Sequence, residues 1–277
     1  MKLNKIGNVC SIVALIIAIV QLFVQGFSFI WAVIVFILLG ICIIIYFDNK
    51  TKKKYMEALK KLQVFHYNIL REQNGYNEFE LDKSINKLQK VCSDISDIFN
   101  VIKDNKVSVC IKYTNRSKDE DLYVKTLARD KLSLNGSDRI KYDKINKEDK
   151  IKDNTDFLEL YKKIIESEAD WQEVFYFANF LPQKHQYNNS HLDLDRNSLP
   201  PDEWYSGFAR NRKWPLPYKS TIVVPIISDD KKNIYGYLCV DSEKNQGFKK
   251  EYDVNILQNI ALIISQTIKI VSEKHLV

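Results

Sequence analysis

The chain has 277 residues, 45% of them apolar and 27% charged, with a formal net charge of +6. Six lysines and Asp48 lie beside one long apolar region, and setting them aside leaves 35 basic and 34 acidic residues in 55–277. A nucleic-acid-binding surface needs a spread basic excess, so this balance excludes a nucleic-acid partner, and the apolar region excludes a purely soluble protein.

The apolar region runs from Ile6 to Phe47 without a single Asp, Glu, Lys or Arg. One crossing of a bilayer needs about 20 residues, so this region is long enough for two. Two apolar halves, 6–24 and 27–47, are separated by a polar interruption that consists of Gln21, Gln25, Gly26 and Ser28. The sequence therefore predicts a transmembrane helical hairpin over 6–47, preceded by a short cytoplasmic N-terminus, 1–5.

Lysines flank both outer ends of this hairpin, whereas the turn between its helices carries no charge. The positive-inside rule then places both termini in the cytoplasm and makes the chain a multi-pass protein of the cell inner (plasma) membrane. A cleaved signal peptide is not expected, because a second and longer apolar segment follows the first directly. The alternative is that the hairpin is an inert anchor.

Residues 48–78 form a juxtamembrane helical linker, in which apolar side chains recur every three or four positions. The expected face of this helix consists of Tyr55, Leu59, Leu62, His66 and Ile69. A second helix is expected from Phe79, with one face made of Leu81, Ile85, Leu88, Cys92, Ile95, Phe99 and Ile102. Such a stripe suits two arrangements equally, a coiled coil between subunits or a helix that covers a sheet.

From Val107 the period changes to two, which predicts a strand over 107–113 and a hairpin partner over 122–128. The polar residues 129–155 predict a long surface excursion. Asp156 and Glu159 resemble a capping box for a short helix ending near Glu166. We expect its apolar face to consist of Phe157, Leu160, Tyr161, Ile164 and Ile165, and a third strand to follow over 174–177.

The segment 178–218 is irregular and holds five of the six prolines. Two further strands are expected over 220–227 and 234–241. The last helix has a face made of Leu257, Ala261, Ile264, Ile268 and Val271. This order of elements predicts an α+β fold, in which an antiparallel sheet flanked by helices follows the transmembrane hairpin.

Motifs in the last third of the chain resemble a known family. Residues 220–226 read Ser-Thr-Ile-Val-Val-Pro-Ile, residues 235–241 read Tyr-Gly-Tyr-Leu-Cys-Val-Asp, and Phe248 and a long amphipathic helix follow. This pattern resembles the C-terminal half of a GAF domain, and we assign 79–277 to a GAF-like cytoplasmic domain. The resemblance implies a sensory module that binds a small molecule between its sheet and its loops. It also implies a homodimer formed through the first and last helices.

Cyclic-nucleotide-binding members of that family carry an Asn-Lys pair, then Phe and an Asp-Glu pair. This chain keeps Asn245, Phe248 and Asp253, but Gln246 and Val254 replace the Lys and the Glu. A cyclic nucleotide is therefore not expected. A covalently attached bilin is not expected either, because 178–218 contains no Cys.

Patterns for catalysis and metal binding are weak. His185 and His191 lack helical ligand spacing, and the calcium-like loop at Asp193 lacks its glycine and its bidentate Glu. No phosphate loop or activated nucleophile is present. The five cysteines have neither disulfide nor zinc spacing and are expected to be reduced thiols. We therefore expect no enzyme, no metal and no cofactor.

The most suggestive side chains for function lie in the irregular segment. An aromatic and basic cluster there comprises Trp204, Tyr205, Phe208, Arg210, Arg212, Trp214 and Tyr218. Arginine pairs with phosphate and aromatic rings stack on bases, so this cluster would suit a nucleotide-like messenger. The alternative is a loop that folds back with its aromatic rings in the core. Asp241 is either a further ligand contact or a turn residue.

Two functions from different classes follow. The first is a membrane receptor or effector, in which a small-molecule messenger rearranges a GAF-like dimer and the change passes along the linker helix to the hairpin. Its layout is analogous to that of membrane effectors of antiviral defence. The second is a passive membrane tether whose domain recruits a protein partner.

Overall fold

The computed structural model describes residues 16, 20, 29–73, 81–103, 106–116, 121–134, 148–166, 171–184, 187–190, 214, 216–228 and 233–275. The chain divides into two compact units, Met1–Tyr55 and Met56–Val277. Each unit is described by itself below.

The first unit contains most of the apolar region. Helix α2 (Phe29–Gln73) is continuous over 45 residues, and its apolar side chains are exposed, with Phe36 at 74% and Ile44 at 69%. Within Val33–Ile69, the most apolar 18 residues have a mean hydropathy of 2.1, and the helix is long and apolar enough to cross a membrane. This supports the second predicted span, 27–47, weakly. The first, 6–24, lies outside the described residues except for Ile16 and Val20, which are helical and exposed.

One other described helix passes the same test of length and hydropathy, Lys250–Val271, whose most apolar 18 residues have a mean hydropathy of 1.4. More than half of these 18 residues, 56%, are buried inside the domain. We therefore read it as a core helix of the second unit and not as a membrane span.

The second unit is built on one antiparallel sheet with strand order β3-β2-β1-β6-β5-β4. This confirms the predicted α+β class. The strands are β1 (Val107–Arg116), β2 (Leu122–Arg129), β3 (Asp149–Lys150), β4 (Tyr176–Ala178), β5 (Ser220–Ile227) and β6 (Ile234–Ser242). The two strands that carry the family-like motifs, β5 and β6, pair over nearly their whole length.

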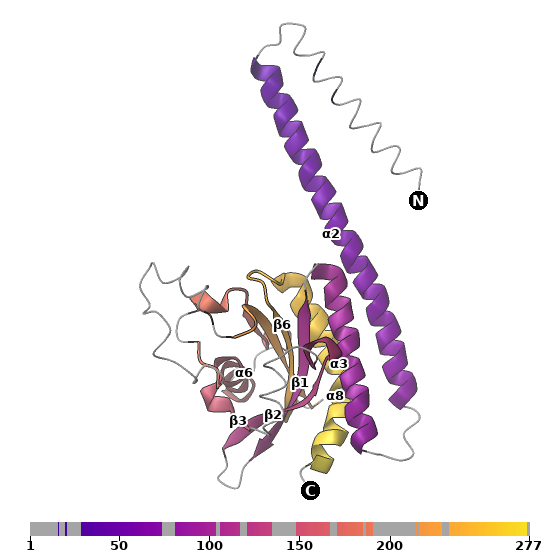
Figure 1. Ribbon diagram of the computed structural model, residues 1–277, viewed down its shortest axis with the longest axis vertical. Coiled ribbons are helices and arrows are strands. Elements are labelled where there is room, and N and C mark those ends of the chain that lie inside the picture. Colours follow the sequence, from indigo (N-terminus) through magenta and orange to yellow (C-terminus); the bar gives the residue numbers. More distant parts are fainter. Residues whose placement is uncertain are drawn as a thin grey trace. The chain divides into compact units, whose positions relative to one another are not determined.

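Helices cover both faces of this sheet (Figure 1). Helices α3 (Leu81–Lys103) and α8 (Asn255–His275) pack on one face, and α6 (Thr155–Glu166) lies on the other. The predicted stripe of α3 is buried at Leu88, Cys92, Ile95, Phe99 and Ile102, and that of α8 is buried at Leu257, Ala261, Ile264, Ile268 and Val271. Of the two arrangements considered for α3, the structure has the helix that covers a sheet.

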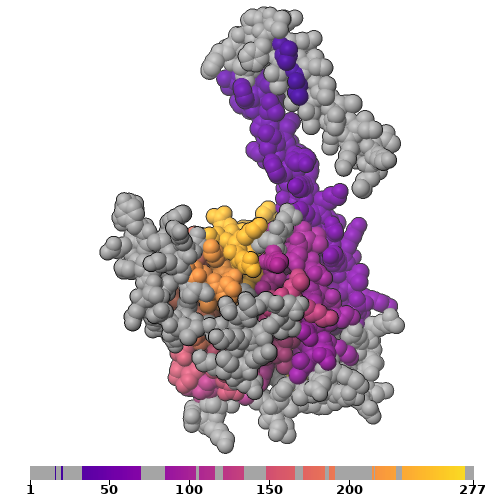
Figure 2. All heavy atoms as spheres, viewed as in Figure 1, coloured from indigo at the N-terminus to yellow at the C-terminus, as the bar shows by residue number. Residues whose placement is uncertain are grey.

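The second half of α2 lies along α3 (Figures 1 and 2). The face predicted for it is partly correct, because Tyr55 is buried and Leu62 and Ile69 are half-buried. Two positions were wrong, since Ala58 and Phe65 are buried in place of the exposed Leu59 and His66. A groove of about 370 Å³ between the two helices is lined by Lys60, Lys61, Val64, Phe65, Asn68, Asp94, Asp97 and Ile98.

The region before α6 corrects two expectations. Part of the predicted excursion 129–155 is structured as helix α4 (Lys131–Leu134), strand β3 and a short 3-10 helix, η1 (Ile151–Asp153). The capping box was also wrong. Asn154 precedes the helix and its carbonyl accepts the first helical bond from Leu158, whereas the carboxyl of Asp156 is buried. Ile165, predicted on the apolar face, is 55% exposed.

Three short elements complete the described chain. They are the 3-10 helices η2 (Trp171–Glu173) and η3 (Leu181–Gln183) and the π-helical turn η6 (Lys250–Val254), which leads into α8.

Candidate ligand-binding site

The two faces of the sheet differ in polarity. Side chains alternate along each strand, and the face under α3 and α8 carries Val109, Ile111, Ile222, Val224, Leu238 and Val240. The opposite face, here called the polar face, carries Cys110 beside Cys239, Lys112 beside Tyr237, and Thr221 beside Asp241. Apolar packing needs no such groups on a covered sheet face. The polar face is therefore the candidate site.

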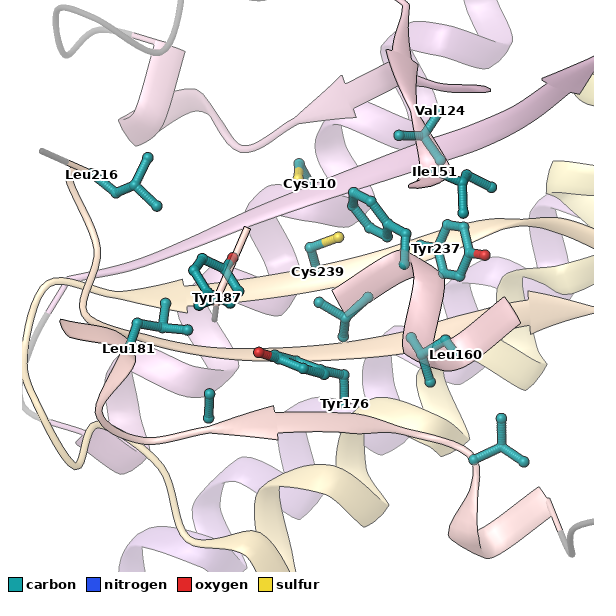
Figure 3. Close-up of a cluster of buried hydrophobic side chains, with 14 of the residues drawn as sticks. Cys110, Val124, Ile151, Leu160, Tyr176, Leu181, Tyr187, Leu216, Tyr237 and Cys239 are labelled. Atoms are coloured by element: carbon teal, nitrogen blue, oxygen red, sulfur yellow. The ribbon is translucent and has the colours of Figure 1, made fainter. Parts of the chain in front are cut away.

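Aromatic rings cover much of the polar face (Figure 3). The ring of Phe157, from α6, lies 4.8 Å from that of Tyr237, measured between centroids. Tyr187 lies 6.4 Å from Tyr176 and 6.2 Å from Trp214 by the same measure. All five side chains are buried. Flat, polarisable surfaces of this kind favour planar or cationic groups.

Asp156 places a carboxyl among these rings, in the first turn of α6. It is 5% exposed, and its Oδ1 accepts a hydrogen bond from the Phe157 backbone N–H at 3.0 Å. Burial raises the pKa of Asp156 to about 7, and the charge of Asp241 raises it too, while the Phe157 N–H and Lys112 oppose the shift. Near neutral pH this carboxyl therefore exists in both forms, as a hydrogen-bond donor and as an acceptor.

The hydroxyl of Tyr237 has no hydrogen-bond partner within the described part of the chain, although its side chain is fully buried. Burial raises the pKa of Tyr237, so the hydroxyl keeps its proton and can donate. Leaving a buried donor without a partner costs roughly 1 to 3 kcal/mol. This hydroxyl is therefore a candidate contact for a hydrogen-bond acceptor on a ligand.

Lys112 and Asp241 are held in place by neighbours on the polar face. Lys112 Nζ donates to Thr126 Oγ1 at 3.0 Å and lies 3.9 Å from Asp149 Oδ2. Asp241 Oδ1 accepts a hydrogen bond from Thr221 Oγ1 at 2.7 Å. These contacts hold the basic side chain of Lys112 and the acidic side chains of Asp149 and Asp241 in the interior, where electrostatic interactions are strong.

Three of the six predicted site residues lie in the described chain. Trp214 is buried, and its indole N–H donates to the carbonyl of Tyr218 at 2.7 Å. The Tyr218 hydroxyl accepts a hydrogen bond from Asn189 Nδ2 at 3.2 Å. Asp241 lies within β6 and not in a turn. The other three, Trp204, Arg210 and Arg212, lie outside the described residues.

Sequence reasoning did not identify Cys110, Lys112, Asp156 or Tyr237 as residues of the candidate site. In an alternating strand, Cys110 and Lys112 occupy the positions that normally face solvent. One signal was available, because the segments 156–166 and 174–187 bring apolar side chains that need a second sheet face to cover. Polar residues of that second face then had to be buried.

A second concave region lies beside edge strand β4. This groove of about 560 Å³ is lined by Glu159, Lys163, Glu173, Phe175, Tyr176, Phe177 and Lys250. The Nζ atoms of Lys163 and Lys250 lie 5.8 and 5.2 Å from the centre of the Phe175 ring. Within the residues that the structure describes, no group of His, Cys, Asp and Glu side chains is arranged to hold a metal.

The family-like residues near the start of α8 have structural partners. Phe248 is buried and packs edge-on against Phe99, with ring centroids 6.2 Å apart. Asp253 forms an ion pair with Lys103 at the end of α3.

Comparisons with known proteins return structural similarity only. No family model matches the chain, and no curated protein matches it. Three solved structures illustrate the similarity found.

The first, a structure of the GAF domain, is 13% identical, with a TM-score of 0.48 over 76% of this chain and 88% of its own. The GAF domain of an Acinetobacter phosphoenolpyruvate-protein phosphotransferase is 11% identical, with a TM-score of 0.47 over 80% of this chain and 98% of its own. Type II free methionine-R-sulfoxide reductase from Thermoplasma acidophilum is 15% identical, with a TM-score of 0.41 over 68% and 94%. At these scores the similarity assigns no activity to the chain.

Proposed function

We propose that the protein is a membrane-anchored sensor whose GAF-like domain binds a small polar molecule on the polar face and passes the binding event to the transmembrane hairpin. One observation carries the proposal. A sheet face covered by aromatic rings holds a carboxyl that titrates near neutral pH and a buried tyrosine hydroxyl without a partner in the described chain. Both are destabilising features for a domain that only has to fold.

The ligand chemistry follows from the groups present. Tyr237 offers a donor, Asp156 a donor or an acceptor, and the rings of Tyr187 and Trp214 a flat surface. A small planar molecule with both hydrogen-bond acceptors and donors, such as a nucleobase-containing messenger, suits these groups. Arg210 and Arg212 would bind its phosphate in this proposal.

Helix α2 is the proposed route of transmission. It is continuous from the apolar stretch into the domain, and its second half packs against α3, whose other contacts include β1 and β2. A shift of β1 on binding would therefore reach α3 and then α2. In a homodimer, which we propose on the family resemblance, the same shift would change how two hairpins pack.

Binding is tested on the full chain in detergent, by thermal shift with a panel of nucleobases, nucleosides and nucleotides and by mass spectrometry of small molecules released on denaturation. Tyr237→Phe should weaken binding of the compound found by about tenfold, the value of one hydrogen bond of about 1.4 kcal/mol. Tyr252→Phe, at an exposed tyrosine, is the matched control. Equal affinity of wild type, Tyr237→Phe and Asp156→Asn would rule out the polar face.

The alternative is a tether that recruits a protein partner, and the groove beside β4 supports it. Edge strands and adjacent grooves accept peptide segments readily, and Lys163 and Lys250 beside Glu159 and Glu173 would suit a segment that carries both charges. Lys163→Glu together with Lys250→Glu should then abolish partner recruitment, while Tyr237→Phe leaves it intact. Under the sensor proposal, Tyr237→Phe should impair function and the two lysine substitutions should not.

A more specific form of the sensor proposal is that the activated protein perturbs the membrane, as antiviral effectors do. It expects that expression of the full chain with its messenger lowers the membrane potential and arrests growth. Residues 56–277 expressed without the hairpin should do neither. A sensor that acts only through a protein partner would leave the membrane potential unchanged.

A further inference from the structure

Two cysteines that are 129 positions apart in the sequence face each other at the centre of the sheet. The register of β1 and β6 sets Cys110 directly opposite Cys239. The backbone of the preceding residue, Val109, bonds Asp130 on the β2 side, since its N–H donates to Asp130 Oδ2 and its carbonyl accepts from the Asp130 N–H. Because backbone groups alternate in direction, those of Cys110 point to β6. Such a hydrogen-bonded pair has Cα atoms about 5.5 Å apart, within the range of disulfide-linked cysteines.

Both cysteine side chains lie on the polar face (Figure 3), and hydrogen bonding between the two thiols is the largest cause of their pKa shifts. Their residues are 3% and 4% exposed. The bond from Cys239 lowers the pKa of Cys110 to about 7, and the charges of Arg129 and Lys112 act in the same direction against burial. The pKa of Cys239 is raised. Arg129 is paired with Cys110 on β2 and its charge favours the Cys110 thiolate, so we expect Cys110 to be the nucleophile.

Cys92 provides the contrast within the same domain. It is fully buried on the apolar stripe of α3, and burial raises its pKa well above the usual value. That is the environment of a cysteine that only fills space. The two sheet cysteines differ from it in their position, because they face each other across the β1–β6 ladder, whereas Cys92 lies on a helix and is hydrogen-bonded to the backbone of Ile111.

We propose that Cys110 and Cys239 are a modification site, at which a small hydroperoxide such as hydrogen peroxide closes a reversible cross-strand disulfide. The Cys110 thiolate attacks one peroxide oxygen, the O–O bond breaks, and hydroxide leaves and takes up a proton. The resulting sulfenic acid is attacked at sulfur by Cys239, which forms the S–S bond and releases water. In total, two thiols lose two hydrogen atoms and the peroxide is reduced to two water molecules.

Formation of the Cys110–Cys239 disulfide would change the geometry of the polar face. Facing residues of a hydrogen-bonded pair have Cβ atoms near 5.5 Å apart, and a disulfide brings them to about 4.5 Å or less. The two central strands must therefore move by about 1 Å, next to Tyr237 and Asp241 on β6. A bond formed under this strain is reduced easily by cytoplasmic dithiols, which makes the modification reversible.

The test uses the full chain in detergent and needs no ligand, so its outcome is independent of the proposed sensor function. Protein exposed to excess hydrogen peroxide is alkylated under denaturing conditions, digested and mapped by mass spectrometry. We expect a peptide pair joining Cys110 to Cys239, a mass loss of two hydrogen atoms, and full recovery with dithiothreitol. If both sheet cysteines stay alkylatable while Cys92 or Cys42 is oxidised, the proposal is wrong.

Three serine variants separate the roles of the two thiols. Cys239→Ser should accumulate a sulfenic acid at Cys110 that dimedone traps, whereas Cys110→Ser should leave Cys239 unmodified. Cys92→Ser, the matched buried control, should form the disulfide as wild type does. Trapping at Cys239 but not at Cys110 would overturn the assignment of the nucleophile, and the wild-type mapping decides the disulfide even if a variant does not fold.

Discussion

At the residue scale, Asp156 is the group whose protonation the fold changes most clearly among the described carboxyls. Its pKa rises from 3.8 to about 7, chiefly because burial removes its hydration. The neighbouring charges are Asp241 and Lys112, and three tyrosines of the site respond to the Asp156 charge, namely Tyr176, Tyr187 and Tyr237. The folded protein therefore binds this proton more tightly than the unfolded chain does. The stability this confers is complete below about pH 4 and is lost as the pH rises through about 7.

Asp156→Asn keeps the acceptor for the Phe157 N–H and removes the titration. Near pH 3, where Asp156 is protonated in both the folded and the unfolded wild type, both proteins should have similar free energies of unfolding. The difference should grow as the pH rises from about 4 to about 7, and near pH 8 the variant should be more stable, by up to about 4 kcal/mol for a shift of about 3 pKa units. Urea unfolding at pH 3 and pH 8 measures the difference. A pH-independent difference would mean that the fold does not raise the pKa of Asp156.

The glycine of the family-like motif, Gly236, has a steric reason. It faces Tyr113 across β1 and β6, and a Cβ there would lie 2.0 Å from the carbonyl oxygen of Lys112. Because that oxygen belongs to backbone, it cannot move without distorting the ladder. We expect Gly236→Ala to lower the free energy of unfolding by about 3 kcal/mol or more. Gly40→Ala, where nothing lies within 4 Å, should leave stability unchanged or slightly higher. Similar stability of the two variants would contradict this explanation.

At the element scale, amphipathic stripes predicted the long helices better than the short ones. Both α3 and α8 cover the sheet over most of their length, so their apolar periodicity matches their buried faces. Helix α6 has only 12 residues and buries a narrower face, which leaves Ile165 exposed. In the second half of α2 the buried side chains are Tyr55, Ala58 and Phe65, and Ala58 contributes little to any hydrophobic pattern.

Helix α3 and the turn η6, which leads into α8, are also joined by a buried ion pair that no periodicity indicates. Lys103 and Asp253 are 8% and 0% exposed, and Asp253 Oδ2 also accepts a hydrogen bond from the Lys249 N–H at 2.6 Å. Lys103→Ala would leave the buried carboxylate without its cation. We expect a loss of about 3 to 5 kcal/mol in the free energy of unfolding, measured by urea denaturation.

The control for this pair is Lys152→Ala, which removes an ion pair to Asp121 from a lysine that is 57% exposed. Its stability should be close to that of wild type, because solvent screens an exposed pair. An equally small effect of Lys103→Ala would show that Asp253 finds another partner.

At the scale of the whole molecule, the lysines beside the apolar region predict that the 56–277 unit lies in the cytoplasm. A protease added to sealed inside-out membrane vesicles should therefore digest this unit, and the same protease added to right-side-out vesicles should leave it intact. Immunoblotting against the C-terminal region measures both. Protection in inside-out vesicles would reverse the predicted topology and remove the basis for a cytoplasmic sensor.

The sequence alone determined the kinds of element and the α+β class, because hydrophobic periodicity and apolar length are properties of one continuous stretch of chain. It also determined the β5–β6 hairpin, since its two strands are neighbours in sequence. Only the tertiary structure decided what the candidate site contains. Strand register sets Cys110 against Cys239 and Lys112 against Tyr237, and the covering by α6 buries Asp156. Register and burial depend on segments far apart in the chain, so neither the shifted pKa of Asp156 nor the paired thiols can be read from local pattern.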